Sequence, residues 1–262
     1  MSLIHDGRFA EGLSWGLKAH VEDPTDAFTN FYVVQGFIWV GEYGEARRIS
    51  DVLAYRVDVA EGRFDEAVHA TQRKMLLDPE NETVIAAAAF VLYDAGRIDE
   101  ALPLYERLRD FRPEGRPITG FNDTMMRLAL ARRKAGDEDA AQAAAQIAKK
   151  DHAALSAAGE KSQFQRRTEA MIAAFENNPD RVIAALKSAM QLGLRDPQVF
   201  GDSMFEDLWV EPRFVALQQE LDAILAAEHD KLLQLICFNN PAPRGWQPMP
   251  ETCEAVGEQL VL

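Results

Sequence analysis

The segment GRFDEAVHATQRKMLLDPEN, residues 62–81, returns in altered form 34 residues later as GRIDEALPLYERLRDFRPEG, residues 96–115. Each copy opens with Gly-Arg, an apolar residue, Asp-Glu and Ala, and each carries a proline 17 positions after its glycine. Gly7 and Gly41 are separated by the same 34 residues, and Pro24 follows Gly7 by the same 17. A fixed period of this length is typical of chains built from stacked structural repeats.

Each residue type in the phrase has a structural role. Glycine permits the left-handed backbone with which a helix often ends, and the acidic pair falls in the first turn of the next helix, where unpaired amide groups favour negative charge. Alanine lets two helices approach closely, and proline ends the second helix. In the second copy the apolar residues have helical spacing: Ile98, Ala101, Leu102, Tyr105 and Leu108. The unit is therefore predicted to be helix–turn–helix, and no alternating β-branched run predicts a strand.

The phrase resembles the tetratricopeptide repeat family. The second copy carries the residues expected of that family at Ala89, Leu92, Ala101, Tyr105 and Pro113. The first copy keeps four matching residues, Phe64, Ala67, Asp78 and Pro79, and departs at three, Asp58, Thr71 and Lys74. The resemblance implies an all-α fold, a right-handed α-α superhelix, whose concave face binds proteins or peptides.

The repeats are expected over residues 1–190 as five to six helix pairs, with the best match at 44–115. The copy at Gly7 has only its second helix, Phe9–Val21, so the chain is expected to begin within a repeat. Gly41 and Gly62 lie only 21 residues apart, so that unit is either truncated or formed of fused helices. Longer downstream intervals predict inserted loops near residues 113–120 and 157–163, and Asn177-Asn178-Pro179 replaces a glycine turn.

Residues 191–236 are predicted to be capping helices, because a stack of repeats must cover its last apolar face. The expected plug is a set of five residues, Phe205, Leu208, Trp209, Phe214 and Leu217. The phrase LWVEPRFVALQQEL resembles the ends of tetratricopeptide halves in bacterial multidomain signalling proteins, of the class III adenylate/guanylate cyclase and winged-helix regulator types.

Residues 237–262 are predicted to be a Pro-rich tail with a short final helix at 254–261. One alternative is a mobile tail, and the other is a segment that Trp246 holds back on the repeats. Two cysteines are too few for a disulfide framework. Cys237 and Cys253 are therefore expected to be reduced, half-buried thiols, with a disulfide as the alternative if the segment folds back.

The composition favours a globular protein whose acidic surface suits basic partners. The net charge of −14 argues against nucleic acid, because phosphate binding needs clustered Lys and Arg. No apolar run approaches the length of a membrane helix, and the N-terminus lacks the basic and apolar regions of a signal peptide. We expect a cytoplasmic protein with no membrane association.

No catalytic or metal-binding pattern is evident. The histidines are scattered, with none at the spacing of a helical zinc site: His5, His20, His69, His152 and His229. Gly159-Glu-Lys-Ser lacks the upstream glycine of a phosphate-binding loop. The sequence thus predicts no catalytic residues, no metal, no cofactor and no enzymatic activity, although a full-length parent could be a nucleotide cyclase.

The first helix of each pair lines the concave face in the tetratricopeptide family, and these positions supply the candidate binding residues. The predicted contacts are Phe31, Gln35, Trp39, Arg56, Phe90, Tyr93, Asp94, Met126, Arg133 and Lys134, with Phe28, Thr83 and Leu130 beside them. Core packing between helices is the alternative for the aromatic residues. The basic cluster of Arg127 and residues 132–134 is expected either to hold a partner's carboxylate or phosphate or to be a solvated helix end.

Three functions follow, in order of preference. The first is a scaffold that binds a protein or peptide as the regulatory part of a larger bacterial signalling protein. The second is a dimerisation module that positions attached catalytic domains, with a homodimer as the active form. The third is an enzyme on a helical scaffold.

Overall fold

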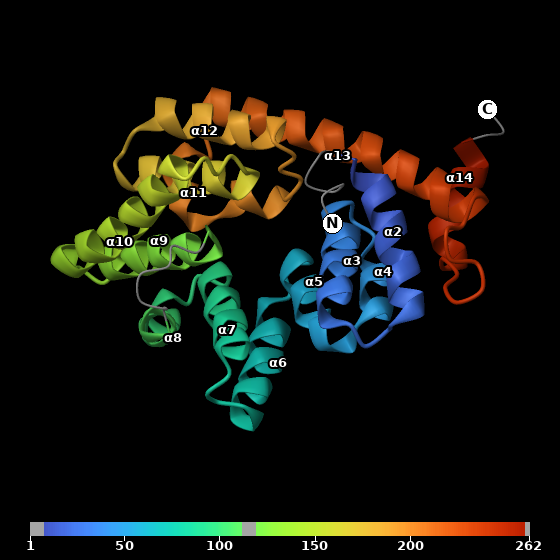
Figure 1. Cartoon of the computed structure of the whole chain (residues 1–262), viewed down its shortest axis with the longest axis horizontal. Coiled ribbons are helices and arrows are strands. Elements are labelled where there is room, and N and C mark those ends of the chain that lie inside the picture. Colours follow the sequence, from blue (N-terminus) through green and yellow to red (C-terminus); the bar gives the residue numbers. More distant parts are fainter. Residues whose placement is uncertain (1–7, 112–118, 260–262) are drawn as a thin grey trace. The chain divides into compact units, whose positions relative to one another are not determined.

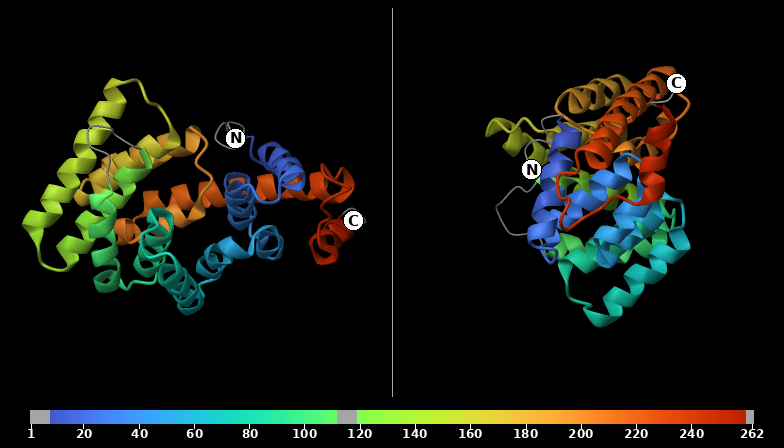
Figure 2. Two further views of the ribbon diagram at one scale, coloured as in Figure 1. Left: turned by 60° about the horizontal axis from the view of Figure 1, so that its bottom comes forward. Right: turned by 90° about the vertical axis from the view of Figure 1, so that its right-hand side faces the viewer.

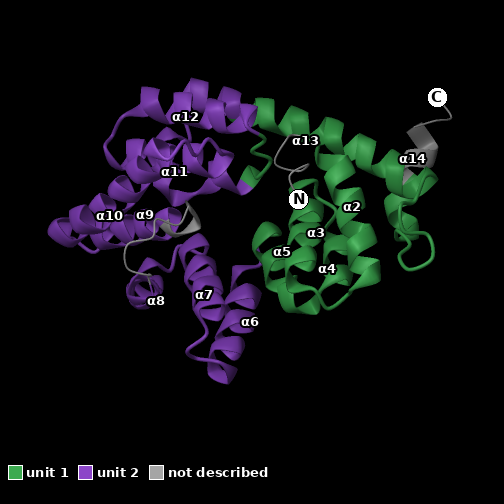
Figure 3. Ribbon diagram, in the orientation of Figure 1, with its two compact units in different colours: residues 1–61, 193–197, 218–262 green, residues 62–192, 198–217 purple. Residues whose placement is uncertain are grey.

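The computed structural model describes residues 8–111 and 119–259, and Gly7 and Pro113 of the repeat pattern lie outside them. The described residues form helices and no β-strand (Figure 1), which confirms the predicted all-α helical-repeat class. They divide into two compact units (Figure 3). Unit 1 comprises residues 1–61, 193–197 and 218–262, and unit 2 comprises residues 62–192 and 198–217.

Unit 1 contains the N-terminal helices and the C-terminal end of the chain. Its elements are α2 (Phe9–Glu22), α3 (Ala27–Trp39), α4 (Tyr43–Ile49), the 3₁₀ helix η1 (Asp51–Leu53), α5 (Ala54–Ala60), most of α13 (Pro212–Phe238) and α14 (Pro250–Gln259). α3 packs between α2 and α4. The short helices α4 and α5 lie in the 21-residue interval between Gly41 and Gly62, where either a truncated unit or fused helices were expected.

Within unit 1, one face of α2 packs against α13. Phe9 and Leu13 of α2 belong to the same buried cluster as Leu232 and Ile236 of α13. The backbone amide of Ala10 also donates a hydrogen bond to a side-chain oxygen of Glu228, with the N and O atoms 3.1 Å apart. Helix α2 and the C-terminal part of α13 therefore share one buried core within unit 1.

Unit 2 consists of antiparallel helix pairs (Figure 2). Its helices are α6 (Phe64–Leu77), α7 (Glu82–Asp94), α8 (Ile98–Asp110), α9 (Thr119–Lys134), α10 (Glu138–Ala157), α11 (Gln163–Phe175) and α12 (Pro179–Gln191). α7 packs on α8, α9 on α10 and α11 on α12. The alanine at the sixth position of each repeat phrase is fully buried: Ala67, Ala101 and Ala141 are all at 0% exposure. This is what a close approach of helices requires.

The turn between α7 and α8 shows why the repeat needs its glycine. Gly96 has a φ of +72°, and the amide of the following Arg97 donates to the carbonyl of Leu92, with N and O 2.8 Å apart. This left-handed helix end is easiest for a residue without Cβ. Asn177 takes the same role between α11 and α12 with a φ of 55°, which confirms the predicted substitution. A loop was expected near residues 157–163, and residues 158–162 do form a non-helical connection between α10, which is 20 residues long, and α11.

The last part of unit 2 is the 3₁₀ helix η2 (Pro197–Gly201), the 3₁₀ helix η3 (Ser203–Leu208) and the start of α13. Phe205 and Phe214 are buried as expected, and their ring centroids lie 5.9 Å apart. Leu217 is also buried, and Leu208 is half-buried. Trp209 was expected in this plug, but its side chain is 47% exposed, because η3 ends one residue earlier and its ring points away from the core.

In unit 1 the chain folds back after α13, and Trp246 is only 6% exposed. The prediction that Trp246 holds this segment in place is confirmed. Cys237 and Cys253 form a disulfide, with their Cα atoms 5.6 Å apart. The expectation of two reduced thiols is therefore wrong, because the returning segment brings residues 16 positions apart into contact.

Candidate binding surfaces

Within residues 8–111 and 119–259, no group of three or more His, Cys, Asp or Glu side chains is placed to hold a metal ion. A hollow of about 180 Å³ lies in unit 2 beside Asn177, Val182 and Phe205, whereas ligand pockets usually measure about 300–1,000 Å³. No helix in this part of the chain is long and apolar enough to cross a membrane. The surfaces of the described helices also carry several of the predicted binding residues.

Helix α3 of unit 1 is apolar on two faces. The side chain of Asp26 caps its N-terminus by accepting a hydrogen bond from the amide of Thr29, with O and N 2.8 Å apart. One face is buried in the core and includes Val33, Val34 and Phe37, all at 0% exposure. A helix that is apolar all round is usually buried on every side. The second face of α3 is apolar but includes an exposed residue, Phe28, so burial in the core does not explain its composition.

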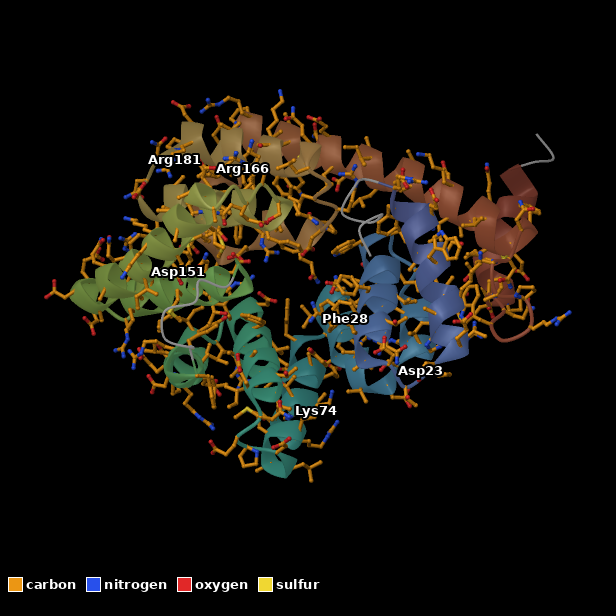
Figure 4. The ribbon with its side chains drawn as sticks, in the orientation of Figure 1. Asp23, Phe28, Lys74, Asp151, Arg166 and Arg181 are labelled. Carbon is orange, nitrogen blue, oxygen red and sulfur yellow. A yellow bond between two sulfur atoms is a disulfide. The ribbon has the colours of Figure 1, made fainter. Side chains whose placement is uncertain are left out.

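That second face carries aromatic residues at helical spacing. Phe28 is 56% exposed (Figure 4), and its ring meets Tyr32 edge to face with centroids 4.9 Å apart. Phe31 packs against the other side of Tyr32 in the same manner, with centroids 5.3 Å apart. Such edge-to-face pairs are favourable beyond the area that they bury, so the three rings hold one another in place.

Arg56 of α5 lies over this cluster. Its guanidinium carbon is 4.7 Å from the centroid of the Phe31 ring, and its Nε donates to the side-chain oxygen of Gln35, with N and O 2.9 Å apart. Gln35 itself is buried. We call Phe28, Phe31, Tyr32, Gln35 and Arg56 the α3–α5 aromatic surface. The terminal Nη groups of Arg56 have no hydrogen-bond partner among the described residues, so the fork remains available to a carboxylate.

A second set of predicted residues meets in unit 2, but it binds the chain's own segment. The guanidinium carbon of Arg127 lies 4.9 Å from the centroid of the Phe90 ring and 5.3 Å from that of Tyr93. Its Nη2 is 2.8 Å from Oδ2 of Asp202, at the start of η3, and the Tyr93 hydroxyl donates to Oδ1 of Asp202 at 3.1 Å. The carboxylate that this site holds therefore belongs to the chain itself.

The electrostatics of this cluster follow from its burial. Burial raises the pKa of the Tyr93 hydroxyl well above its usual range. Burial alone would raise the pKa of Asp202 and lower that of Arg127. Their mutual attraction outweighs it, so the pKa of Asp202 is lowered and that of Arg127 is raised. The two residues form a charged pair in which Asp202 is 7% exposed.

Several predicted contacts are occupied by packing. Gln35, Tyr93 and Met126 are buried, at 5%, 0% and 0% exposure, so a partner cannot reach them in this conformation. The ring of Trp39 faces Phe9 with centroids 6.1 Å apart. For the aromatic residues Trp39 and Tyr93, these contacts match the alternative role of packing between helices. Asp94 is exposed at the end of α7.

The basic cluster at the end of α9 is neutralised by neighbouring carboxylates. Lys134 lies 2.7 Å from Glu206, measured from Nζ to Oε2. Arg133 pairs with Glu138 and lies over the Phe175 ring, with its guanidinium carbon 3.5 Å from the centroid. Arg132 pairs with Glu106 and with Asp137, and Arg127 with Asp202. A partner's anion would have to displace these carboxylates.

The structure thus brings together Phe31, Gln35 and Arg56 in unit 1, and Phe90 and Tyr93 in unit 2. Sequence reasoning did not include Tyr32 or Asp202. Tyr32 was detectable, because it follows Phe31 and lies four residues after Phe28. Asp202 gave no local signal, since 109 residues separate it from Tyr93.

Comparison with known proteins supports the repeat assignment for part of the chain. Residues 58–117 match the tetratricopeptide repeat family. No curated protein sequence matches the chain. One solved structure with similarity is titled "MamA MSR-1 C2"; it is 18% identical, the alignment covers 67% of this chain and 95% of that one, and the TM-score is 0.38. The class defined by the helix pairs and the family match is a helical-repeat protein with tetratricopeptide-type repeats at residues 58–117.

Proposed function

We propose that the chain is a helical-repeat scaffold that binds a protein or peptide partner through the α3–α5 aromatic surface. The observation that carries this proposal is the cluster of the exposed Phe28 with the half-buried Phe31 and Tyr32, with Arg56 held over it. Aromatic residues and arginine dominate binding energy at protein interfaces. Phe28 also exposes more than half of its side chain to solvent, which burial against a partner would remove.

The chemistry of this surface favours one kind of partner segment. Arg56 is fixed through its Nε and its contact with Phe31, so its terminal nitrogens are pre-organised for a carboxylate. The rings of Phe28 and Tyr32 supply apolar area beside it. The proposed ligand is therefore a peptide that places an apolar side chain next to a carboxylate, either of Asp or Glu or of a chain terminus.

The wider context is part of the same proposal. The chain would act in the cytoplasm as the regulatory or interaction region of a larger bacterial signalling protein, whose attached domain could be a nucleotide cyclase. No enzymatic activity is assigned to the chain itself. The family match at residues 58–117 supports the interaction role.

Dimerisation is the second candidate, and a specific observation favours it. Trp209 and Val210, directly after η3, are 47% and 88% exposed. Tryptophan is one of the residues enriched at the cores of protein interfaces. A homodimer formed through these residues would position attached domains without any contact at the α3–α5 aromatic surface.

A displayed library of random peptides tests the first candidate. Peptides selected on the wild-type chain should be enriched in an apolar residue next to Asp, Glu or the C-terminus. Phe28→Ala and Arg56→Ala should each weaken the selected peptides about tenfold or more. Arg56→Lys should weaken them as well, because lysine lacks the planar fork.

Leu77→Ala is the matched control, because Leu77 is an exposed apolar residue, 87% accessible, on α6 of unit 2. It should bind the peptides as the wild type does. Equal affinity for wild type, Phe28→Ala and Arg56→Ala, with circular dichroism unchanged, would remove the α3–α5 aromatic surface as the site.

A further inference from the structure

The segment that follows α13 in unit 1 is held at both ends. α13 ends at Phe238, and residues 239–254, which we call the strap, return along unit 1 and enter α14. The disulfide between Cys237 and Cys253 closes the strap into a loop. Both cysteines are half-buried, so a small thiol can reach this bond without global unfolding.

An apolar anchor fixes the middle of the strap. The ring of Trp246 is stacked on that of Phe37, with centroids 6.0 Å apart and an angle of 27° between the planes. Gly245 lies so close to Val21 that a Cβ at this position would collide with the valine side chain. Ala242 is buried beside them. The strap therefore fills a slot in the core of unit 1, and the slot opens to solvent when the strap leaves.

A buried carboxylate forms the polar anchor. Glu45 of α4 is 0% exposed. Its Oε1 accepts hydrogen bonds from the amide of Met249 at 2.6 Å and from the hydroxyl of Thr252 at 3.0 Å. Arg48, on the solvent side, pairs with its other oxygen at 2.9 Å and donates to the carbonyl of Gln247. Water can replace the strap's donors only when the strap opens, so these contacts form and break together.

The disulfide decides how often the strap opens. A crosslink that closes a loop of about 15 residues lowers the open population roughly a hundredfold, by limiting the freedom of the open chain. The remaining anchors are the ring of Trp246 and a few hydrogen bonds, and segments with few buried contacts open locally at low cost.

We propose that Cys237–Cys253 is a reversible redox latch on the strap, opened by a cellular dithiol. A thiolate of the dithiol attacks one sulfur and forms a mixed disulfide, and the other protein sulfur leaves as a thiolate. The second thiol of the reductant then resolves the mixed disulfide. The protein gains two electrons and two protons as two thiols, and the dithiol becomes a disulfide. The strap then opens and uncovers the slot around Phe37 and Val21. This latch is independent of the peptide partner proposed above.

Hydrogen exchange of the full chain tests the latch. Exchange at the amides of Trp246 and Met249 is compared in the oxidised protein and after treatment with dithiothreitol. Reduction should speed exchange in residues 242–252 about a hundredfold and leave α9 and α10 of unit 2 unchanged. Oxidised glutathione should restore the slow exchange. The double variant Cys237→Ser, Cys253→Ser should match the reduced protein and show no response to dithiothreitol.

Gly245→Ala separates the strap from the redox chemistry. This substitution should speed hydrogen exchange around Trp246 in the oxidised protein, because the added methyl group collides with Val21. Mass spectrometry should show that the disulfide is still intact. Three results would overturn the proposal. The first is equal hydrogen exchange of the strap in oxidised and reduced protein, and the second is failure of oxidised glutathione to restore slow exchange. The third is loss of protection throughout α2–α4 on reduction, which would show that the disulfide is a fixed structural crosslink.

Discussion

Replacing Asp202 with alanine should cost unit 2 much of its stability. This carboxylate accepts hydrogen bonds from Arg127 through Nη2 at 2.8 Å and Nε at 3.2 Å, and from the Tyr93 hydroxyl at 3.1 Å. It also accepts one from the amide of Met204 at 2.9 Å, at the start of η3. Asp202→Ala removes all four acceptor contacts and leaves the Arg127 cation among aromatic rings.

The magnitude follows from the exposure of the pair. The Asp202 side chain is 6% exposed and that of Arg127 is 20% exposed. Removal of one partner from a buried ion pair costs about 3–5 kcal/mol, and loss of a helix cap costs about 1 kcal/mol. Arg127 keeps some solvent and its contacts with Phe90 and Tyr93, so we expect the lower end, about 3 kcal/mol. In urea this corresponds to a midpoint lower by about 1–3 M.

Urea unfolding followed by circular dichroism measures this effect, and Glu206→Ala provides the control in the same segment. Glu206 pairs with Lys134 at 2.7 Å, but the two side chains are 45% and 33% exposed, so its loss should cost less than about 1 kcal/mol. The double variant Arg127→Met, Asp202→Ala should recover part of the loss, because it removes the unpaired cation.

Acid pH gives an independent check. The pKa of Asp202 is lowered in the folded protein. Its contribution to the free energy of unfolding is therefore complete above the pKa of the unfolded chain, about 3.9. This contribution is lost as the pH falls from there through the pKa of the folded protein. The difference between wild type and Asp202→Ala should therefore shrink below about pH 4. An Asp202→Ala variant no less stable than Glu206→Ala at pH 7 would refute the reasoning and mean that Arg127 is adequately solvated.

Three further predictions concern other parts of the chain. Trp246→Ala should lower the free energy of unfolding by about 3 kcal/mol in urea titrations, because a buried ring is lost, and a loss no larger than that of Leu77→Ala would contradict its role as an anchor. Gly96→Ala should cost about 1 kcal/mol through its left-handed φ, measured as a lower melting temperature. Sedimentation velocity should show wild-type dimers that Trp209→Ala dissociates if the capping segment self-associates, and a clean monomer at high concentration would exclude that candidate.

Local sequence was sufficient to predict the helix pairs and their turns. Gly96 and Ala101 act within one repeat, through a left-handed turn and a close helix contact, and both effects depend on neighbours a few residues away. Asn177 could be recognised as a substitute for glycine on the same grounds. The connection at residues 158–162 lies where a loop was expected, whereas the length of the Ala-rich α10 was not predicted.

The candidate site was only partly predictable. The spacing of Phe28, Phe31 and Gln35 places them on one face of α3, and this required only helical geometry. The burial of Tyr93 and Met126 was not predictable in this way. The position of a residue in a helix determines the face on which its side chain lies, but not which other element packs against that face. Trp209 illustrates the same limit, since its exposure depends on where a 3₁₀ helix ends.

The sequence by itself determined the class of structure, because the repeat signals are local: glycine for the turn, alanine for the contact, proline for the stop. It also placed aromatic residues on α3. The tertiary structure alone decided which of these residues remain exposed, and it paired Tyr93 and Arg127 with Asp202. It likewise brought Cys237 to Cys253. These pairings join residues far apart in the chain, or depend on a segment that folds back, and no local preference encodes them.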